Sequence, residues 1–563
     1  MSEMSGARYL ARSLDAYGVT SVFLVPTVLS ATLVAMEEET AITRVVAHGE
    51  KAAAYMADGY ARATGRPGVC MAQNIGAANL AAGLRDAYLG CSPVLALTGG
   101  PYEYSRGRNY YQEIEDFPLF KPVTRSSRQV HDAARLPDML GQAFCDATVG
   151  KPGPVHLELA GHTGDVVEAQ PLTAEVPQRE ERRVPAVRTA PDPDAVVAAV
   201  AALRAALRPV IVSGGGVRAS GASTEVVALA ERLGAPLATS LNGKDTVPAD
   251  HPLAVGIPGL YARASANQVL LEADLVVYVG SQTGSQLTLT WQVPSPGTRV
   301  VHVDIDPREP GRHFAGTVPV VADARLGVQA LLDALGDVDA SRTAAWQERA
   351  AALSARWRDD VSALVHSDDA PLRPERLVDE LGVLLPEDAL VVADTGHAGM
   401  WTAGHLDLTS PGQGFIRAAG SLGWALPAGI GAQIARPDAS VVVFTGDGGL
   451  YYHLSELETA ARWQVPLTIV VNDNQSLNQE INPYTVAYGG ELSGRHHELW
   501  HFRDVDLAAV AESLGVTGIR VTKPSELAPA MARAVETPGP VLVDVTTARD
   551  AVAPKGSATR ASA

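Results

Sequence analysis

The sequence predicts an α/β protein made of three doubly wound parallel-sheet domains. Short apolar runs, such as 441–444 and 467–471, alternate with segments of helical period and end at glycine or polar turns, which is the pattern of parallel βαβ units. The alternation occurs in three stretches, 1–168, 195–335 and 371–547, with polar linkers between them. A chain of 563 residues, 46% of them hydrophobic, is long enough to bury a core in each stretch.

The composition excludes some classes of partner. A net charge of −18 and a pI near 5.2 argue against nucleic acid and against anionic membrane surfaces. The three cysteines, Cys70, Cys91 and Cys145, lack metal-ligand spacing and indicate a reduced, cytoplasmic protein. No segment approaches the roughly 18 uninterrupted apolar residues of a membrane span, so we expect a soluble protein.

In the first stretch, apolar runs at 22–25, 68–72 and 94–98 end at polar or glycine turns, and the last strand is expected at 154–159. Glu50 ends a short apolar run and begins an alanine-rich helix. An acid in the first turn of a helix suits the helix dipole. That structural role alone accounts for most glutamates in this position.

In the second stretch, the expected strand 209–213 runs into a glycine triplet that contains Gly215 and Gly216. A later strand ends at Asp304 and is followed by Asp306. A strand leading into glycines, with acids at the end of a later strand, is compatible with a bound nucleotide. The signal is weak, because a full G-x-G-x-x-G motif is missing.

The third stretch contains two polar turns that are expected at one sheet edge. The first is Gly446-Asp447-Gly448-Gly449 and the second is Asn472-Asp473-Asn474. Asp447 offers a carboxylate oxygen and Asn474 an amide oxygen, which Mg²⁺ accepts together with phosphate oxygens. Glycines and a following helix start let backbone N–H groups approach an anion. The prediction is a metal-bridged diphosphate, and the alternative is that Gly-Asp-Gly is only a turn.

Gly446-Asp447-Gly448, Glu456-Leu457, Pro466 and Asn474 together resemble the diphosphate motif of thiamine-diphosphate enzymes. The segment around Glu50, the turn at 73–79 and the segment 111–113 resemble the pyrimidine-binding domain of the same enzymes. The resemblance spans nearly the whole chain. One departure is Asp473, which stands where the family usually has a further asparagine; shifting the motif by one residue would make Asp473 the metal ligand in place of Asn474.

The resemblance implies a site. Magnesium would be held by Asp447, Asn474 and the carbonyl of Ser476, and Glu50 would lie against the aminopyrimidine ring. Leu422 would press the cofactor into a bent shape, and the Gly420 carbonyl would accept a bond from the cofactor amino group. The implied cofactor-binding residues are Gly396, His397, Gly420, Leu422, Gly446, Asp447, Gly448, Gly449, Asn474, Ser476, Leu477 and Asn478, and the implied catalytic residues are Glu50, Gln112 and Glu491.

Two parts of the site stay open at this stage. Glu491 lies in the polar loop 479–505 beside the metal turn, where it serves either a substrate or only the solvated surface. In the resembling family the middle domain carries FAD in some members, ADP in others and nothing in many. Gly215, Gly216, Asp304 and Asp306 are the candidates for such a nucleotide, with ADP expected before FAD.

Tyr111-Gln112 and the basic tail 548–563 look similar to the branch with oxalyl-CoA decarboxylase and 2-hydroxyacyl-CoA lyase, in which the tail covers a CoA thioester. The resemblance therefore implies a carbon-carbon lyase that cleaves a 2-hydroxyacyl-CoA to a carbonyl compound and formyl-CoA. The tail would act as a lid over the acyl-CoA. The substrate-contacting residues implied are Tyr111, Arg549, Lys555 and Arg560.

Two alternatives remain. The first is an acetolactate-synthase-like decarboxylase and carboligase, which normally shows a flavin-contact segment that 280–285 does not match. The second is a non-catalytic nucleotide-binding α/β protein, against which Glu50 and the second metal turn argue. In the family the first domain of one chain meets the third domain of its partner, which implies a homodimer or homotetramer.

Overall fold

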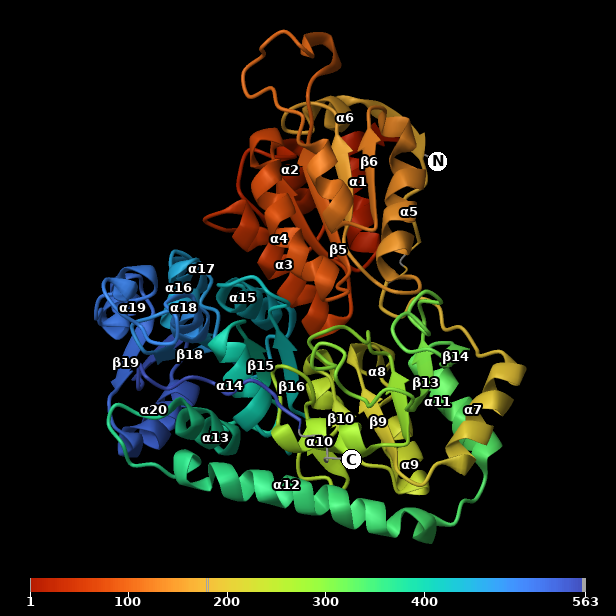
Figure 1. The fold of residues 1–563 in the computed structure, drawn as a ribbon. Coiled ribbons are helices and arrows are strands. Elements are labelled where there is room, and N and C mark those ends of the chain that lie inside the picture. Colours follow the sequence, from red (N-terminus) through yellow and green to blue (C-terminus); the bar gives the residue numbers. More distant parts are fainter. Residues whose placement is uncertain (1, 179, 181, 559–563) are drawn as a thin grey trace.

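The computed structural model describes residues 2–178, 180 and 182–558 as three α/β domains, each built on a six-stranded parallel sheet (Figure 1). The predicted fold class is confirmed. Each sheet draws its strands from one of the three stretches of alternating pattern. Among the described residues, no helix combines the length and the apolar character that crossing a membrane requires.

The N-terminal sheet has the strand order β3-β2-β4-β5-β7-β6. A short antiparallel pair, β1 with β8, lies beside it. The strands are β1 Ser2–Ser5, β2 Ser21–Leu24, β3 Thr43–Val46, β4 Gly68–Ala72, β5 Val94–Gly99, β6 Ser126–Val130, β7 Val155–Leu159 and β8 Pro171–Ala174, and the α-helices are α1 Gly6–Ala16, α2 Ser30–Glu39, α3 Glu50–Thr64, α4 Ala77–Leu89, α5 Leu136–Thr148 and α6 Asp165–Ala169.

The middle sheet has the order β11-β10-β9-β12-β13-β14. Its strands are β9 Pro209–Ser213, β10 Leu237–Thr239, β11 Ala254–Gly256, β12 Leu275–Val279, β13 Arg299–Asp304 and β14 Val318–Val321, and its α-helices are α7 Pro193–Ala205, α8 Gly215–Ser220, α9 Ser223–Leu233, α10 Ala264–Glu272 and α11 Ala324–Leu335. The long helix α12, Ala344–Val365, then runs beneath the middle and C-terminal domains (Figure 1).

The C-terminal sheet has the order β16-β15-β17-β18-β20-β19. Its central strands are buried along almost their whole length, as expected of a parallel sheet covered by helices on both faces. The strands are β15 Leu390–Ala393, β16 Gly414–Arg417, β17 Val441–Gly446, β18 Thr468–Asp473, β19 Thr517–Val521 and β20 Val541–Thr546, and the α-helices are α13 Pro374–Leu384, α14 His397–His405, α15 Ala425–Ala435, α16 Asp447–Tyr451, α17 Glu456–Arg462, α18 Ile481–Ala487, α19 Leu507–Ser513 and α20 Pro524–Glu536.

The N- and C-terminal domains share one apolar core, because α3 packs closely against α15. A Cβ atom on Gly59 would lie 2.0 Å from the backbone oxygen of Ala428, and one on Gly431 would lie 1.9 Å from that of Met56. Only glycine permits this approach. The pairing brings the carboxyl edge of the C-terminal sheet under the N-terminal domain of the same chain.

Candidate active site at the edge of the C-terminal sheet

Four neighbouring strands, β16, β15, β17 and β18, end side by side at the carboxyl edge of the C-terminal sheet. Parallel strands place the turns that follow them at one edge, which is where α/β proteins bind ligands. The structure therefore brings together the predicted residues of four separate segments. These are Gly420 and Leu422 after β16, Gly396 and His397 after β15, Asp447 to Gly449 after β17, and Asn474 to Asn478 after β18.

Asp447 is buried, with 2% of its surface exposed, and its Oδ2 atom has no hydrogen-bond partner among the described residues. Burial raises the pKa of Asp447 to about 8, and the negative charge of Asp473 adds to the rise. Asp473 Oδ2 and Asn472 Oδ1 are also buried without a described partner. Buried oxygens of this kind are normally satisfied, so this group of oxygens fits a cation.

The second turn is held by its own side chains. Asn474 Oδ1 accepts hydrogen bonds from the Ser476 backbone N–H (3.1 Å) and from Ser476 Oγ (3.0 Å), and Asp473 Oδ1 accepts one from the Gln475 N–H (3.1 Å). No group of three or more His, Cys, Asp or Glu side chains in the described ranges is arranged to hold a metal ion. Asp447, Asn474 and the Ser476 carbonyl all offer oxygen, the ligand atom that Mg²⁺ shared with a diphosphate prefers.

Two leucines reach the glycine turns. A Cβ atom on Gly448 would lie 2.5 Å from Leu477 Cδ2, and one on Gly396 would lie 3.7 Å from Leu422 Cδ2. Gly396 has a φ of +69°, which favours glycine, and it caps the start of α14. Free backbone N–H groups at this helix start suit a phosphate. The predicted apolar residues thus line the same edge as the predicted glycines.

His397, expected as a diphosphate contact, is buried at the start of α14. Burial lowers the pKa of His397 to about 4, and its Nδ1 atom donates to Asn478 Oδ1. A neutral ring brings no positive charge to a phosphate. Asn478 in turn donates to the backbone oxygens of Arg549 (3.1 Å) and Ala551 (2.8 Å), so it anchors the C-terminal tail.

The predicted residues of the N-terminal domain gather at a different turn. Glu50 Oε2 accepts from Asn79 Nδ2 (3.1 Å), and the Gln112 backbone oxygen accepts from Asn74 Nδ2 (2.9 Å). Both amides belong to the segment that follows β4. Glu50 and the Gln112 backbone therefore contact the same segment, and Tyr111, next to Gln112 in the sequence, is 78% exposed.

Three family models match this chain. The N-terminal TPP binding domain of thiamine pyrophosphate enzymes matches residues 4–119, the central domain matches 196–331 and the C-terminal TPP binding domain matches 394–545. The probable acetolactate synthase large subunit of Methanocaldococcus jannaschii is 32% identical over 554 residues, which cover 96% of this chain and 92% of that protein. The chain belongs to the thiamine pyrophosphate enzyme family.

Other relatives of this thiamine pyrophosphate enzyme have similar names. Acetolactate synthase isozyme 2 large subunit of Escherichia coli is 32% identical over 96% of this chain and 95% of its own length. The acetolactate synthase large subunit of Corynebacterium glutamicum is 31% identical over 97% of this chain and 87% of its own length. The likeness therefore extends over all three domains.

The tail of the enzyme is packed rather than free. Arg549 Nε donates to the Asn474 backbone oxygen (3.1 Å), and its Nη2 atom donates to Gln475 Oε1 (2.8 Å). Ala551 and Ala553 are buried in the core of the C-terminal domain. These contacts of Arg549 brace the turn that carries Asn474, and its contact with a substrate stays a prediction. Lys555 is exposed, and Arg560 lies outside the described residues.

Glu491 is exposed on the loop after α18. Three glycines near it, Gly489, Gly490 and Gly494, have positive φ angles. Its exposure leaves both sequence interpretations, substrate acid and solvated loop acid, in place.

Sequence reasoning missed Asp394, which lies at the end of β15. Its carboxylate accepts hydrogen bonds from the Thr395 N–H (2.8 Å), the Gly423 N–H (3.1 Å) and Thr445 Oγ1 (3.0 Å). Burial raises the pKa of Asp394 to about 7. An acid directly after a buried parallel strand is the signal that points to this edge.

A cavity of about 770 Å³ lies where the three domains meet, and three of the four candidate nucleotide-binding residues, Gly215, Gly216 and Asp304, line it. Gly216 is also required by packing, because a Cβ atom there would lie 2.7 Å from Gly280 Cα. Asp306 instead turns to Arg308 (2.9 Å) and lies 3.7 Å from Lys151.

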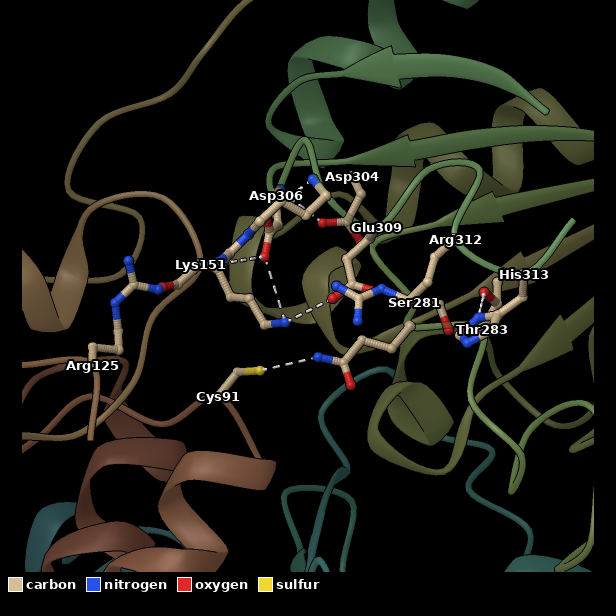
Figure 2. Close-up of polar contacts among 12 residues, drawn as sticks. Cys91, Arg125, Lys151, Ser281, Thr283, Asp304, Asp306, Glu309, Arg312 and His313 are labelled. Atoms are coloured by element: carbon tan, nitrogen blue, oxygen red, sulfur yellow. Dashed lines mark hydrogen bonds and ion pairs between the residues drawn. The ribbon is translucent and has the colours of Figure 1, made fainter. Parts of the chain in front are cut away.

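Figure 2 shows how the N-terminal and middle domains join beside this cavity. Lys151 Nζ donates to Glu309 Oε1 (3.0 Å), and Gln282 Nε2 donates to Cys91 Sγ (3.9 Å). Each pair joins one residue of the N-terminal domain to one of the middle domain. The cavity wall is therefore polar on this side.

Proposed function

We propose that this enzyme is a thiamine-diphosphate- and Mg²⁺-dependent 2-oxoacid decarboxylase and carboligase of the acetolactate synthase type. The observation that carries the proposal is the likeness to acetolactate synthases: relatives from an archaeon and from bacteria are 31–32% identical over at least 96% of this chain. The fit of the sheet-edge residues to a metal and a diphosphate supports it. The relatives favour this activity over cleavage of a 2-hydroxyacyl-CoA.

Bound thiamine diphosphate would supply the electron sink for breaking and forming carbon-carbon bonds. Asp447, Asn474 and the Ser476 carbonyl would hold Mg²⁺. Backbone groups at Gly396 and Gly446 to Gly449 would face the diphosphate. Leu422 and Leu477 would exclude water from the edge. Glu50 would exchange a proton with the aminopyrimidine ring through its carboxylate.

The active site is proposed to need two chains. The hydrogen bond of Glu50 to Asn79 keeps its carboxylate within the N-terminal domain. The C-terminal domain of the same chain instead meets this region through Glu456, which accepts the His48 N–H at 3.0 Å. In a homodimer or homotetramer, Glu50 of one chain and Asp447 of another chain would contribute to the same active site. Such an assembly accounts for both contacts.

The contacts of the C-terminal tail argue against an acyl-CoA substrate. A lid that closes over a CoA phosphate needs free cations, whereas the Arg549 guanidinium is bonded to the metal turn. Exposed Tyr111 and Lys555 remain the features that favour an acyl-CoA ligand.

The central cavity is proposed to hold ADP or FAD. Its volume of about 770 Å³ and the acid Asp304 at its wall suit an adenine nucleotide. Mass spectrometry of the denatured, freshly purified protein would identify the nucleotide. Its absence from a protein that binds thiamine diphosphate normally would contradict this part of the proposal.

The main test is turnover. We expect the purified protein, with thiamine diphosphate and Mg²⁺, to consume pyruvate, release CO₂ and form acetolactate, measured as acetoin after acid treatment. Omission of either cofactor should abolish the activity. Rapid cleavage of a 2-hydroxyacyl-CoA by a protein that ignores pyruvate would contradict the proposal.

A further inference from the structure

We propose that Asp86 of the N-terminal domain is a positioning residue that sets the direction of the Gly420 carbonyl in the C-terminal domain. The inference rests on the proposed function, in which that carbonyl receives the amino group of the cofactor. No sequence motif points to Asp86, because it lies in the last turn of an alanine-rich helix, α4.

The Asp86 carboxylate bridges two alternate backbone N–H groups of one loop. Oδ1 accepts the Ala419 N–H, and Oδ2 accepts the Ser421 N–H at 2.9 Å. These residues flank Gly420 and lie more than 330 positions away along the chain. Asp86 itself is 0% exposed, whereas the loop residues that donate to it are partly exposed. A charged acceptor makes hydrogen bonds stronger than those of a neutral one.

The hydrogen bond of the Ser421 N–H to Asp86 also sets the direction of the Gly420 carbonyl, because both groups belong to one peptide bond. The Ser421 N–H and the Gly420 carbonyl belong to the same peptide unit, which is trans. In a trans peptide the N–H and the C=O point in opposite directions. Because the N–H points to Asp86, the Gly420 carbonyl points away from α4.

The opposite side of this peptide is open. A Cβ atom on Gly420 would meet nothing within 4 Å, and Gly420 is exposed. The loop also touches the metal side of the edge, since a Cβ atom on Gly423 would lie 2.5 Å from Tyr452 Cβ and 2.9 Å from the Gly449 oxygen. The loop that carries this carbonyl thus lies beside the turn that begins with Asp447.

Asp86 is itself held by a buried network. Arg62 Nη2 donates to the Asp86 backbone oxygen (2.9 Å) and to Asp58 Oδ2 (2.7 Å). Arg62 Nη1 donates to the Arg417 backbone oxygen (2.7 Å), and Trp424 Nε1 donates to Asp58 Oδ2 (2.9 Å). The N-terminal domain therefore forms hydrogen bonds with this loop at its start (Arg417), in its middle (Ala419 and Ser421) and at its end (Trp424).

Asp394 completes the hold from within the C-terminal domain. Its carboxylate accepts the Gly423 N–H at 3.1 Å. Alternate N–H groups at 419, 421 and 423 are thus bonded to buried carboxylates from two domains. These bonds restrict the backbone of the loop, and this restriction holds the Gly420 carbonyl in one direction.

The test compares Asp86→Asn with Asp245→Asn. An asparagine offers one acceptor oxygen and an NH₂ group, so one of the two N–H groups would face a donor. Asp245 is a matched control, because it also accepts a backbone N–H of the C-terminal domain from another domain, that of Phe415 at 3.0 Å. It does not bond residues 419–421.

In the cofactor-free protein, we expect amide hydrogen exchange over 418–423 to rise about tenfold in Asp86→Asn, as loss of one hydrogen bond implies. Asp245→Asn should leave that segment unchanged. With cofactor, Asp86→Asn should still bind Mg²⁺ and thiamine diphosphate nearly normally, since the diphosphate site is intact. Proton exchange at the reactive carbon of the bound cofactor should slow at least about tenfold.

The outcomes separate the two claims. Wild-type amide exchange and wild-type cofactor proton exchange in Asp86→Asn would overturn the role of Asp86 alone. A wild-type protein that does not bind thiamine diphosphate would overturn the proposed function together with this inference. If Asp86→Asn unfolds, Asp86→Glu, which keeps two acceptor oxygens on a longer arm, replaces it; unaltered cofactor proton exchange in that variant would also overturn the role.

Discussion

Asp447 directly follows β17, Asp473 ends the neighbouring strand β18, and the charge of Asp473 opposes ionisation of Asp447. Burial is the larger cause, and together they raise the pKa of Asp447 to about 8. Each acid keeps one buried oxygen without a partner in the described part of the chain. A divalent cation would relieve both the repulsion and the missing bonds.

Mg²⁺ binding should therefore depend on pH. Below about 8 the ligand-free Asp447 is mostly protonated, so a metal ion must displace a proton. We expect the affinity for Mg²⁺, measured by titration in the presence of thiamine diphosphate, to rise about tenfold per pH unit up to that point and then level off. Asp447→Asn should bind weakly at every pH. A flat profile for the wild type would contradict the assignment of Asp447.

The same shift predicts how the cofactor-free protein responds to pH. The pKa of Asp447 is raised from 3.8 in the unfolded chain to about 8. Its contribution to stability is thus fully present below the lower value and is lost as pH rises through the higher one. Thermal denaturation should show a smaller loss of stability with rising pH in Asp447→Asn than in the wild type. Equal losses of stability in the variant and the wild type would mean that groups other than Asp447 cause the pH dependence.

Glu50→Gln keeps the size of the side chain and its acceptor for Asn79, but it cannot exchange a proton. We expect normal cofactor binding and a decrease of about 100-fold or more in proton exchange at the reactive cofactor carbon. Asn79→Ala is the matched control, since it removes only the partner that bonds Glu50 at 3.1 Å. Unchanged proton exchange in Glu50→Gln would return Glu50 to the role of a helix-start acid.

Truncation of the tail distinguishes a brace from a lid. Removing residues 549–563 deletes the Arg549 bonds to the metal turn and exposes the pocket of Ala551 and Ala553, which are 3% and 2% exposed. We expect a lower melting temperature and loss of cofactor retention. Removing only 554–563 should leave cofactor retention near wild type. If the two truncated proteins were equally stable and both had a raised KM for an acyl-CoA, the tail would act as a lid over the substrate.

Lys151→Met tests the join between the N-terminal and middle domains. It leaves the Glu309 carboxylate, whose side chain is 6% exposed, without its 3.0 Å partner, which destabilises by about 1–3 kcal/mol. Arg312→Met is the control, because Arg312 pairs with the same carboxylate at 3.3 Å while being 47% exposed, and such pairs contribute about 1 kcal/mol or less. Chemical denaturation measures both. A larger effect from Arg312 would contradict the interpretation.

The sequence by itself determined the three α/β units, and it predicted which segments would form the candidate metal site. Hydrophobic periodicity and turn residues report local backbone structure. Because parallel strands end at one edge, two polar turns after neighbouring strands were enough to predict that Asp447 and Asn474 lie close together. The same logic would have found Asp394, which follows a buried strand.

Only the tertiary structure decided the contacts of Asp86 and Arg549. Asp86 lies within a helix whose period indicates only burial, and its partners lie more than 330 positions away. The tail reads as a free basic segment, yet its alanines fill the C-terminal core and its arginine braces Asn474. Hydrogen bonds between distant segments depend on how the domains pack. Domain packing depends on the surfaces of the whole chain, and a local sequence pattern does not encode it.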